Sequence, residues 1–289
     1  MLTLVLFNVT NGLILGMFYV LMALGVSLIL NLSNVINFAH GNFLALGGYL
    51  AFVLEPYLGY WGALLAGPIC VGVIGLIIER TAIRKVYDRD PVYSLLLTFG
   101  LAFIIQDVCR TVWGPNGLPL SIPNVLNTPL SSQFFFVTGY RVFLIGVVIV
   151  TVAALFAFLG YTRVGTRIRA GTFDLDTVSA LGINIGLLRS LNFAVGIFLA
   201  GLAGVLAGGQ IGLNPNMGDN LLLPAFIAII VGGVGNLTGT LVGGLVIGVA
   251  SAVTSIWWSA GSDVIMYILM IVVLLVRPHG IMGEEGVMT

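Results

Sequence analysis

The stretch Leu13-Ile-Leu-Gly-Met-Phe-Tyr-Val-Leu-Met-Ala-Leu-Gly-Val-Ser-Leu-Ile-Leu30 decides the fold class of this chain. It is apolar apart from Ser27 and carries no Lys, Arg, Asp or Glu. The hydrocarbon core of a bilayer offers no water to backbone polar groups, so an apolar run of about 18 residues or more is typical of a membrane-spanning helix. The function of the chain therefore has to be sought inside a bilayer.

The composition extends this conclusion to the whole chain. Hydrophobic residues make up 59% of its 289 residues and charged residues only 8%, whereas about 25% of the residues of a soluble domain are charged. This balance excludes a soluble enzyme, and the chain has no basic face for nucleic acid. We predict an all-α fold in which residues 1–289 form a single transmembrane domain, a polytopic bundle of about eight to ten spans.

Apolar runs between the charged segments mark the candidate spans. The region 221–243 has two interpretations, because Pro224 and the glycines at 232, 233 and 235 allow either a pair of spans or a re-entrant turn that protein must cover. The candidate spans lie at residues 9–30, 36–54, 61–78, 92–109, 142–160, 190–209, 221–235, 239–258 and 263–276.

The basic residues indicate the orientation. Nine of the eleven Lys and Arg residues lie in segments 79–90 and 160–189 or at Arg277, which follows the last span. Even numbers of spans separate these segments, so the positive-inside rule assigns all of them to the cytoplasm and the N-terminus to the outside. Segment 111–140, rich in Pro, Asn and Ser, is then an ordered external loop. It serves either as a docking surface or as a simple connector.

Several kinds of chemistry are excluded by missing residues. Lys85 is the only lysine and no G-x-x-x-x-G-K-[ST] motif precedes it, so the chain cannot build a P-loop and does not hydrolyse ATP itself. His40 and His279 are far apart and lack the H-E-x-x-H spacing of a zinc site. No carboxylate lies in the middle of a candidate span, where a coupling ion would bind.

Neutral polar residues recur between the first two candidate spans. Asn34, Asn37 and His40 follow one another every three residues, and Asn42 comes next. One interpretation is a break in the helices, lined by hydrogen-bonding groups that suit a passage for a polar solute. The other is that these side chains cap helix ends and hold neighbouring helices together. Neither interpretation implies catalysis.

The predicted cytoplasmic segment 160–189 contains a second unusual feature. Residues 174–181 read as a short amphipathic helix that begins at Asp174, with Leu175, Val178 and Leu181 on one face, and Gly182 ends it. An apolar helix face exposed to the cytoplasm predicts insertion into a groove on a partner protein. The alternative is a helix that lies on the lipid surface.

Motifs along nearly the whole chain resemble the branched-chain amino-acid type of ABC importer permease. The Asn-Phe-Ala-His-Gly and Leu-Gly-Ile elements are specific in combination. The motifs are Asn11-Gly12-Leu13 with Gly16 and Tyr19, Asn37-Phe38-Ala39-His40-Gly41, Arg169-Ala170 with Asp174, Ala180-Leu181-Gly182-Ile183, Gly232-Gly233, Gly235-Asn236 and Gly239-Thr240.

The resemblance implies a subunit of the bacterial inner membrane with several partners. These are a second homologous permease, two cytoplasmic ATPases and an external solute-binding protein. ATP and Mg²⁺ would bind to the ATPases, and no cofactor to this chain. Residues 167–183, including Arg169, would form the loop that couples ATP hydrolysis to transport, and Gly233 would border the solute path with Asn37, His40 and Asn42.

Two features leave the solute open. Asn42 stands where such permeases commonly carry an acidic residue, and relatives of this family also import urea, short amides and aromatic acids. The second hypothesis for function is a passive channel for a small neutral solute such as urea, which also needs a neutral polar lining. An intramembrane enzyme is disfavoured because no nucleophile and base stand at helical spacing within a span.

Overall fold

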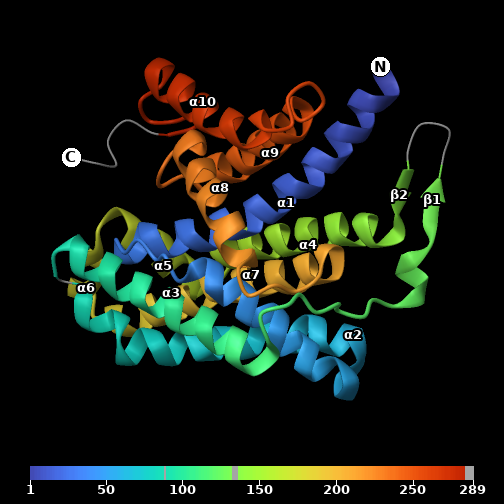
Figure 1. The fold of residues 1–289 in the computed structure, drawn as a ribbon. Coiled ribbons are helices and arrows are strands. Elements are labelled where there is room, and N and C mark those ends of the chain that lie inside the picture. The colour runs from blue at the N-terminus through green and yellow to red at the C-terminus, as the bar shows by residue number, and fades with distance from the viewer. Residues whose placement is uncertain (88, 132–135, 284–289) are drawn as a thin grey trace. The chain divides into compact units, whose positions relative to one another are not determined.

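The computed structural model describes residues 1–87, 89–131 and 136–283 and is almost entirely helical there (Figure 1). The helices are α1 (Leu2–Ser33), α2 (His40–Thr81), α3 (Pro91–Trp113), α4 (Gly139–Tyr161), α5 (Arg163–Phe173), α6 (Leu175–Ala180), α7 (Ile185–Ile211), α8 (Met217–Gly232), α9 (Leu237–Thr254) and α10 (Gly261–Val276), with the short 3₁₀ helices η1 (Ile83–Val86) and η2 (Asn124–Asn127) and the strands β1 (Pro129–Ser131) and β2 (Phe136–Thr138).

The helices confirm the predicted polytopic membrane fold. In the described residues six helices are long and apolar enough to cross a membrane: α1, α2, α3, α4, α7 and α9. The helices α8 and α10 are apolar and shorter, with 16 residues each. The orientation of the termini stays a prediction.

The longest helix, α2, is a hairpin of two spans. Its 42 residues would extend about 63 Å if straight, twice the roughly 30 Å of a hydrocarbon core. Gly59 interrupts it with φ 65° and ψ 171°, a conformation that favours glycine. A Cβ placed on Gly67 would lie 3.0 Å from the carbonyl oxygen of Gly47, so the second half folds back along the first. The two halves correspond to the predicted spans 36–54 and 61–78.

The chain divides into two compact units. The first contains residues 1–24, 121–149 and those from 220 onward, and the second contains residues 25–120 and 150–219. Helices α1, α4 and α8 contribute residues to both.

Glycines bring helices of the first unit into close contact, because residues without a Cβ let two backbones approach each other. A Cβ on Gly16 in α1 would lie 3.0 Å from the Cα of Leu245 in α9. In the same unit Gly232 of α8 and Gly239 of α9 meet backbone to backbone. Figure 1 shows α8, α9 and α10 in orange and red beside the first part of α1. Residues 221–243 therefore form most of α8, a turn and the start of α9. The choice between a pair of spans and a re-entrant turn stays a prediction.

In the second unit the main packing joins α2 to α7. Gly47 lies against Gly201, and a Cβ on Gly48 would lie 3.0 Å from the carbonyl oxygen of Gly204. A side chain at these positions would overlap the backbone of the facing helix. The glycines therefore determine how closely α2 and α7 approach each other.

The segment between α3 and α4 is ordered where it is described. It contains η2 and an antiparallel pairing of β1 with β2 in which Pro129 lies opposite Thr138. Strands of three residues are too short for an alternating pattern to reveal, so the sequence predicted an ordered loop without them. The external position of this loop stays a prediction.

Candidate functional site

The predicted break between the first two spans is present in the second unit, and we call residues 34–42 the polar break. Helix α1 ends at Ser33, and Asn34 follows with φ 51°, the only positive φ of a non-glycine residue in the described chain. Asn tolerates this left-handed conformation, which commonly ends a helix. The side chain of Asn34 is exposed. The structural role of this residue is that its backbone conformation ends α1.

The far side of the polar break starts α2 and is held by α3. The Asn37 side-chain oxygen accepts a hydrogen bond from the backbone N–H of Ala39 at 3.1 Å. The Asn42 amide donates to the carbonyl oxygen of Ala102 in α3 at 2.7 Å, and the backbone N–H of Phe38 donates to the Thr98 hydroxyl at 3.2 Å. Part of the amide chemistry therefore serves structure, as the second interpretation of these residues predicted.

The remaining polar atoms of the break have no such role. The Nδ2 atom of Asn37, both ring nitrogens of His40 and the Oδ1 atom of Asn42 are buried without a hydrogen-bond partner in the described residues. The His40 ring lies against the α1 backbone, because a Cβ on Gly25 would lie 2.7 Å from its Nε2 atom. Buried polar atoms without partners cost free energy.

Gly233 belongs to the first unit and has a packing role there. Its φ is 114°, and a Cβ on it would lie 2.6 Å from the backbone nitrogen of Gly283. The neighbouring Met282 N–H donates to the carbonyl oxygen of Gly232 at 3.0 Å. Close packing against the segment after α10 accounts for glycine at this position.

The short helix predicted in segment 160–189 is α6. The carboxylate of Asp174 caps it by accepting from the Thr177 N–H at 2.9 Å and from the Thr177 hydroxyl, and this hydroxyl bond is the main cause that lowers the pKa of Asp174. Gly182, with φ 79°, follows the helix. The structure therefore agrees with the predicted start and end of the helix.

The apolar face of α6 differs from the prediction. Val178 is only 3% exposed and packs within the chain, and Leu175 contacts Gly171. Leu181 is 74% exposed, and Phe173, which the sequence reading missed, is 81% exposed. The expectation that Leu175, Val178 and Leu181 together face outward is wrong, because α5 and α7 pack against α6 and take up part of that face.

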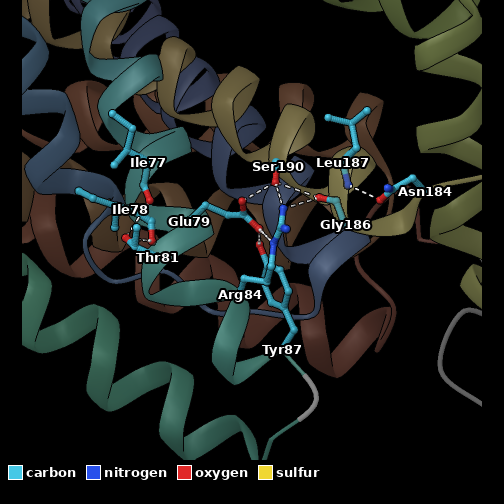
Figure 2. Close-up of polar contacts among 10 residues, drawn as sticks. All are labelled: Ile77, Ile78, Glu79, Thr81, Arg84, Tyr87, Asn184, Gly186, Leu187 and Ser190. Carbon is cyan, nitrogen blue, oxygen red and sulfur yellow. Dashed lines mark hydrogen bonds and ion pairs between the residues drawn. The ribbon is translucent and has the colours of Figure 1, made fainter.

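A buried charge at the end of α2 lies close to this segment, and the sequence reading missed it (Figure 2). The Glu79 carboxylate accepts hydrogen bonds from the Tyr87 hydroxyl at 3.0 Å and from the Ser190 hydroxyl of α7. Arg84 lies 3.4 Å from the same carboxylate and forms a salt bridge with it. Arg84 also donates to the Gly186 carbonyl oxygen at 2.9 Å and to Ser190. We call Glu79, Arg84, Tyr87 and Ser190 the Glu79 clamp.

The Glu79 carboxylate is buried, and the groups around it compensate for the loss of water. The side chain of Glu79 is 0% exposed and that of Arg84 is 41% exposed. The pKa of Tyr87 is raised, mainly by burial of the phenol and to a lesser extent by the nearby Glu79 carboxylate. The phenol therefore keeps its proton and remains a hydrogen-bond donor. The guanidinium of Arg189 stacks 4.8 Å from the centre of the Tyr87 ring. Each carboxylate oxygen of Glu79 therefore has a partner, as a buried charge requires.

Comparisons with known proteins decide the family. The profile of the family described as "Branched-chain amino acid transport system / permease component" matches residues 8–274. Over 96% of this chain and 95% of the relative, the chain is 34% identical to the high-affinity branched-chain amino acid transport system permease protein LivH of Salmonella typhimurium. It is 33% identical to LivH of Escherichia coli over the same shares, and 33% identical to BraD of Pseudomonas aeruginosa over 97% of this chain and 96% of BraD. The chain belongs to this permease family.

Membership confirms the predicted class of function. The protein is a transport subunit of the ABC importer type and a multi-pass protein of the bacterial inner membrane, and it is not itself an enzyme. The comparisons do not support the passive-channel alternative.

The sequence of the permease held weak signals of the Glu79 clamp. Glu79 is the only acidic residue between the apolar end of α2 and the basic residues that follow it, a position that suggests a local partner. Ser190 gave no signal at all, because it lies 111 residues away and meets Glu79 only in the fold.

Proposed function

We propose that this permease carries branched-chain amino acids across the inner membrane. Its partners in this proposal are a second homologous permease, two cytoplasmic ATPases that bind ATP and Mg²⁺, and an external solute-binding protein. The identity of about one third to LivH and BraD over nearly the whole chain carries the proposal, since both are named as high-affinity branched-chain amino acid permeases. The chain itself needs no cofactor.

The polar break provides the part of the solute path that we assign to this subunit. Asn37, His40 and Asn42 are buried, neutral and incompletely hydrogen-bonded. A neutral lining suits an amino acid, which carries one charge of each sign and no net charge. In the alternating-access cycle that we propose, the polar break opens, and solute or water supplies the missing partners. In the second unit, Asn34 borders the path by ending α1. The assignment of Gly233, which lies in the first unit, stays a prediction from the sequence.

Segment 160–189 provides the ATPase contact. The exposed side chains of Leu181 and Phe173 lie on either side of α6, and Arg169 is exposed on α5. In the predicted orientation these groups face the cytoplasm, where a groove on an ATPase can take up the two apolar side chains. Asp174 and Gly182 hold the ends of α6, and Leu175 and Val178 anchor it to the chain. The external loop 111–140 is the candidate contact of the solute-binding protein.

Uptake into proteoliposomes tests this function. The vesicles contain the whole membrane complex, with the binding protein outside and ATP inside. We expect ATP-dependent uptake of labelled leucine that isoleucine and valine inhibit and urea does not. Uptake that urea inhibits and leucine does not, or leucine flux through this chain without ATPases, would contradict the proposal.

A substitution on α6 tests the ATPase contact separately. Leu181→Asp places a charge where an apolar groove is expected and should lower uptake about tenfold or more. The matched control, Leu181→Met, keeps an apolar side chain and should retain uptake. Equal uptake by the two variants contradicts the docking role of Leu181.

A further inference from the structure

Helices α2 and α7 pack together along most of their length. In the first half of α2 the contacts are Gly47 with Gly201 and Gly48 with Gly204. In the second half of α2 a Cβ on Gly72 would lie 3.6 Å from the Cβ of Phe198. A Cβ on Gly75 would lie 2.9 Å from the side chain of Ile197. Close-packed backbones of this kind resist sliding and bending, because any shift forces atoms to overlap.

The Glu79 clamp closes this pair of helices at one end. Glu79 lies in the last turns of α2, and Ser190 lies in the second turn of α7. The Ser190 hydroxyl donates to Glu79 and accepts from Arg84, so a charge-assisted network joins the two helices. Apolar side chains of similar volume often give equal or greater stability than a buried ion pair. The directional bonds of the clamp therefore serve to fix one relative position of α2 and α7.

The clamp holds the turn of α7 that directly follows α6. Four residues, 181–184, separate the end of α6 from the start of α7, and they span at most about 14 Å. Asn184 caps α7 by accepting from the Leu187 N–H at 2.9 Å, and Arg84 binds the carbonyl oxygen of Gly186 in the same turn. A displacement of α6 therefore reaches a turn that is fastened to α2.

The first turn of α2 begins at His40, inside the polar break. Gly47, in this first half of the hairpin, lies against both Gly67 of the second half and Gly201 of α7. We propose that Glu79, Arg84 and Ser190 are positioning residues for coupling: they fasten α7 to α2, so that both move as one arm carrying a displacement of α6 to the polar break. This inference rests on the proposed contact between α6 and an ATPase.

Removing single bonds of the clamp tests the inference in the reconstituted complex. Ser190→Ala and Glu79→Gln should leave ATP hydrolysis within about twofold of the unsubstituted complex and lower leucine uptake about tenfold, because a hydrogen bond to a charged group is lost or weakened. The ratio of uptake to hydrolysis is the deciding quantity, since general misfolding lowers both together. Ser251→Ala, which alters a buried serine of α9, is the matched control and should keep the ratio. An unchanged ratio in Ser190→Ala overturns the inference.

A milder variant covers the case in which Glu79→Gln fails to assemble. Tyr87→Phe removes one hydroxyl from the clamp and should lower the same ratio by a smaller factor than Ser190→Ala. Tyr161→Phe removes an exposed hydroxyl at the end of α4 and is its control. Equal ratios for the two phenylalanine variants contradict the role of the clamp.

A disulfide tests whether α2 and α7 move as one arm. Cys70 and Cys109 are first replaced by Ala, and Gly72→Cys and Phe198→Cys then place two thiols on facing turns. Their Cβ separation of 3.6 Å falls within the range of about 3.5–4.5 Å that a disulfide needs. Oxidation should leave uptake equal to that of the reduced protein. Loss of uptake that a reductant restores overturns the inference.

These outcomes can be told apart from failure of the proposed function. If Leu181→Asp abolishes uptake while the clamp variants keep the ratio, only the arm is wrong. If Leu181→Asp leaves uptake unchanged, the proposed ATPase contact is wrong, and the arm fails with it.

Discussion

Two buried polar sites of the second unit are built in opposite ways. In the polar break Asn37, His40 and Asn42 are neutral and keep atoms without hydrogen-bond partners in the described residues. In the Glu79 clamp the buried group is a carboxylate, and both of its oxygens have hydrogen-bond partners. A satisfied network stabilises one arrangement, whereas an unsatisfied one loses little when it changes. We therefore expect the clamp to keep α2 and α7 in one relative position, and the residues of the polar break to change conformation.

The largest expected effect is the loss of stability when the clamp loses its carboxylate. Glu79→Leu leaves Arg84 and Ser190 without their shared acceptor. Removing one partner of a buried ion pair costs about 3–5 kcal/mol, and we expect about 3 kcal/mol because Arg84 can turn to solvent. Thermal unfolding of the purified protein in detergent measures the change. A variant as stable as the unsubstituted protein would show that the clamp does not hold the fold.

The polar break should respond in the opposite way. His40→Leu replaces a ring whose nitrogens have no described partner with an apolar side chain of similar size. We expect the free energy of unfolding to stay equal or to rise by about 1 kcal/mol, while leucine uptake falls, because the proposed solute path loses a polar group.

The matched control for this change is a buried amide whose nitrogen has a partner, while its Oδ1 atom has none in the described residues. The Asn192 amide donates to the Leu28 carbonyl oxygen at 2.5 Å, so Asn192→Leu should destabilise the protein by about 1–3 kcal/mol. If His40→Leu destabilises the protein as much as Asn192→Leu does, His40 has a structural role and the contrast between the two sites disappears.

The sequence predicts one of these sites much better than the other. Local signals mark the polar break, because Asn34, Asn37 and Asn42 interrupt an apolar pattern within nine residues. The same is true of α6, whose cap and terminal glycine are close in sequence. The clamp depends on Glu79 and Ser190, 111 residues apart, and no periodicity relates such positions. The burial of Val178 also depends on the tertiary fold. Its place on the same helix face as Leu175 and Leu181 could not reveal that it packs against the rest of the chain.

The smallest expected effect is that of a substitution in the cap of α6. Unlike Glu79, the Asp174 side chain is fully exposed, so the loss of its charge should matter little. Asn caps a helix about as well as Asp, so Asp174→Asn should change the ratio of uptake to ATP hydrolysis by less than about twofold. Asp174→Ala loses the cap and should lower that ratio further.

The pH dependence of this cap has a defined sign. The Thr177 hydroxyl lowers the pKa of Asp174 below its ordinary value of 3.8, so the ionised carboxylate is favoured in the folded protein. The stabilisation that it gives is fully present above that ordinary value and is lost only as the pH falls through the lower, folded pKa. Between pH 7 and pH 5 the protein and Asp174→Asn should therefore show the same change in ratio. If the ratios of the unsubstituted protein and of Asp174→Asn diverged over this interval, a group on a partner protein would interact with the Asp174 carboxylate in addition to Thr177.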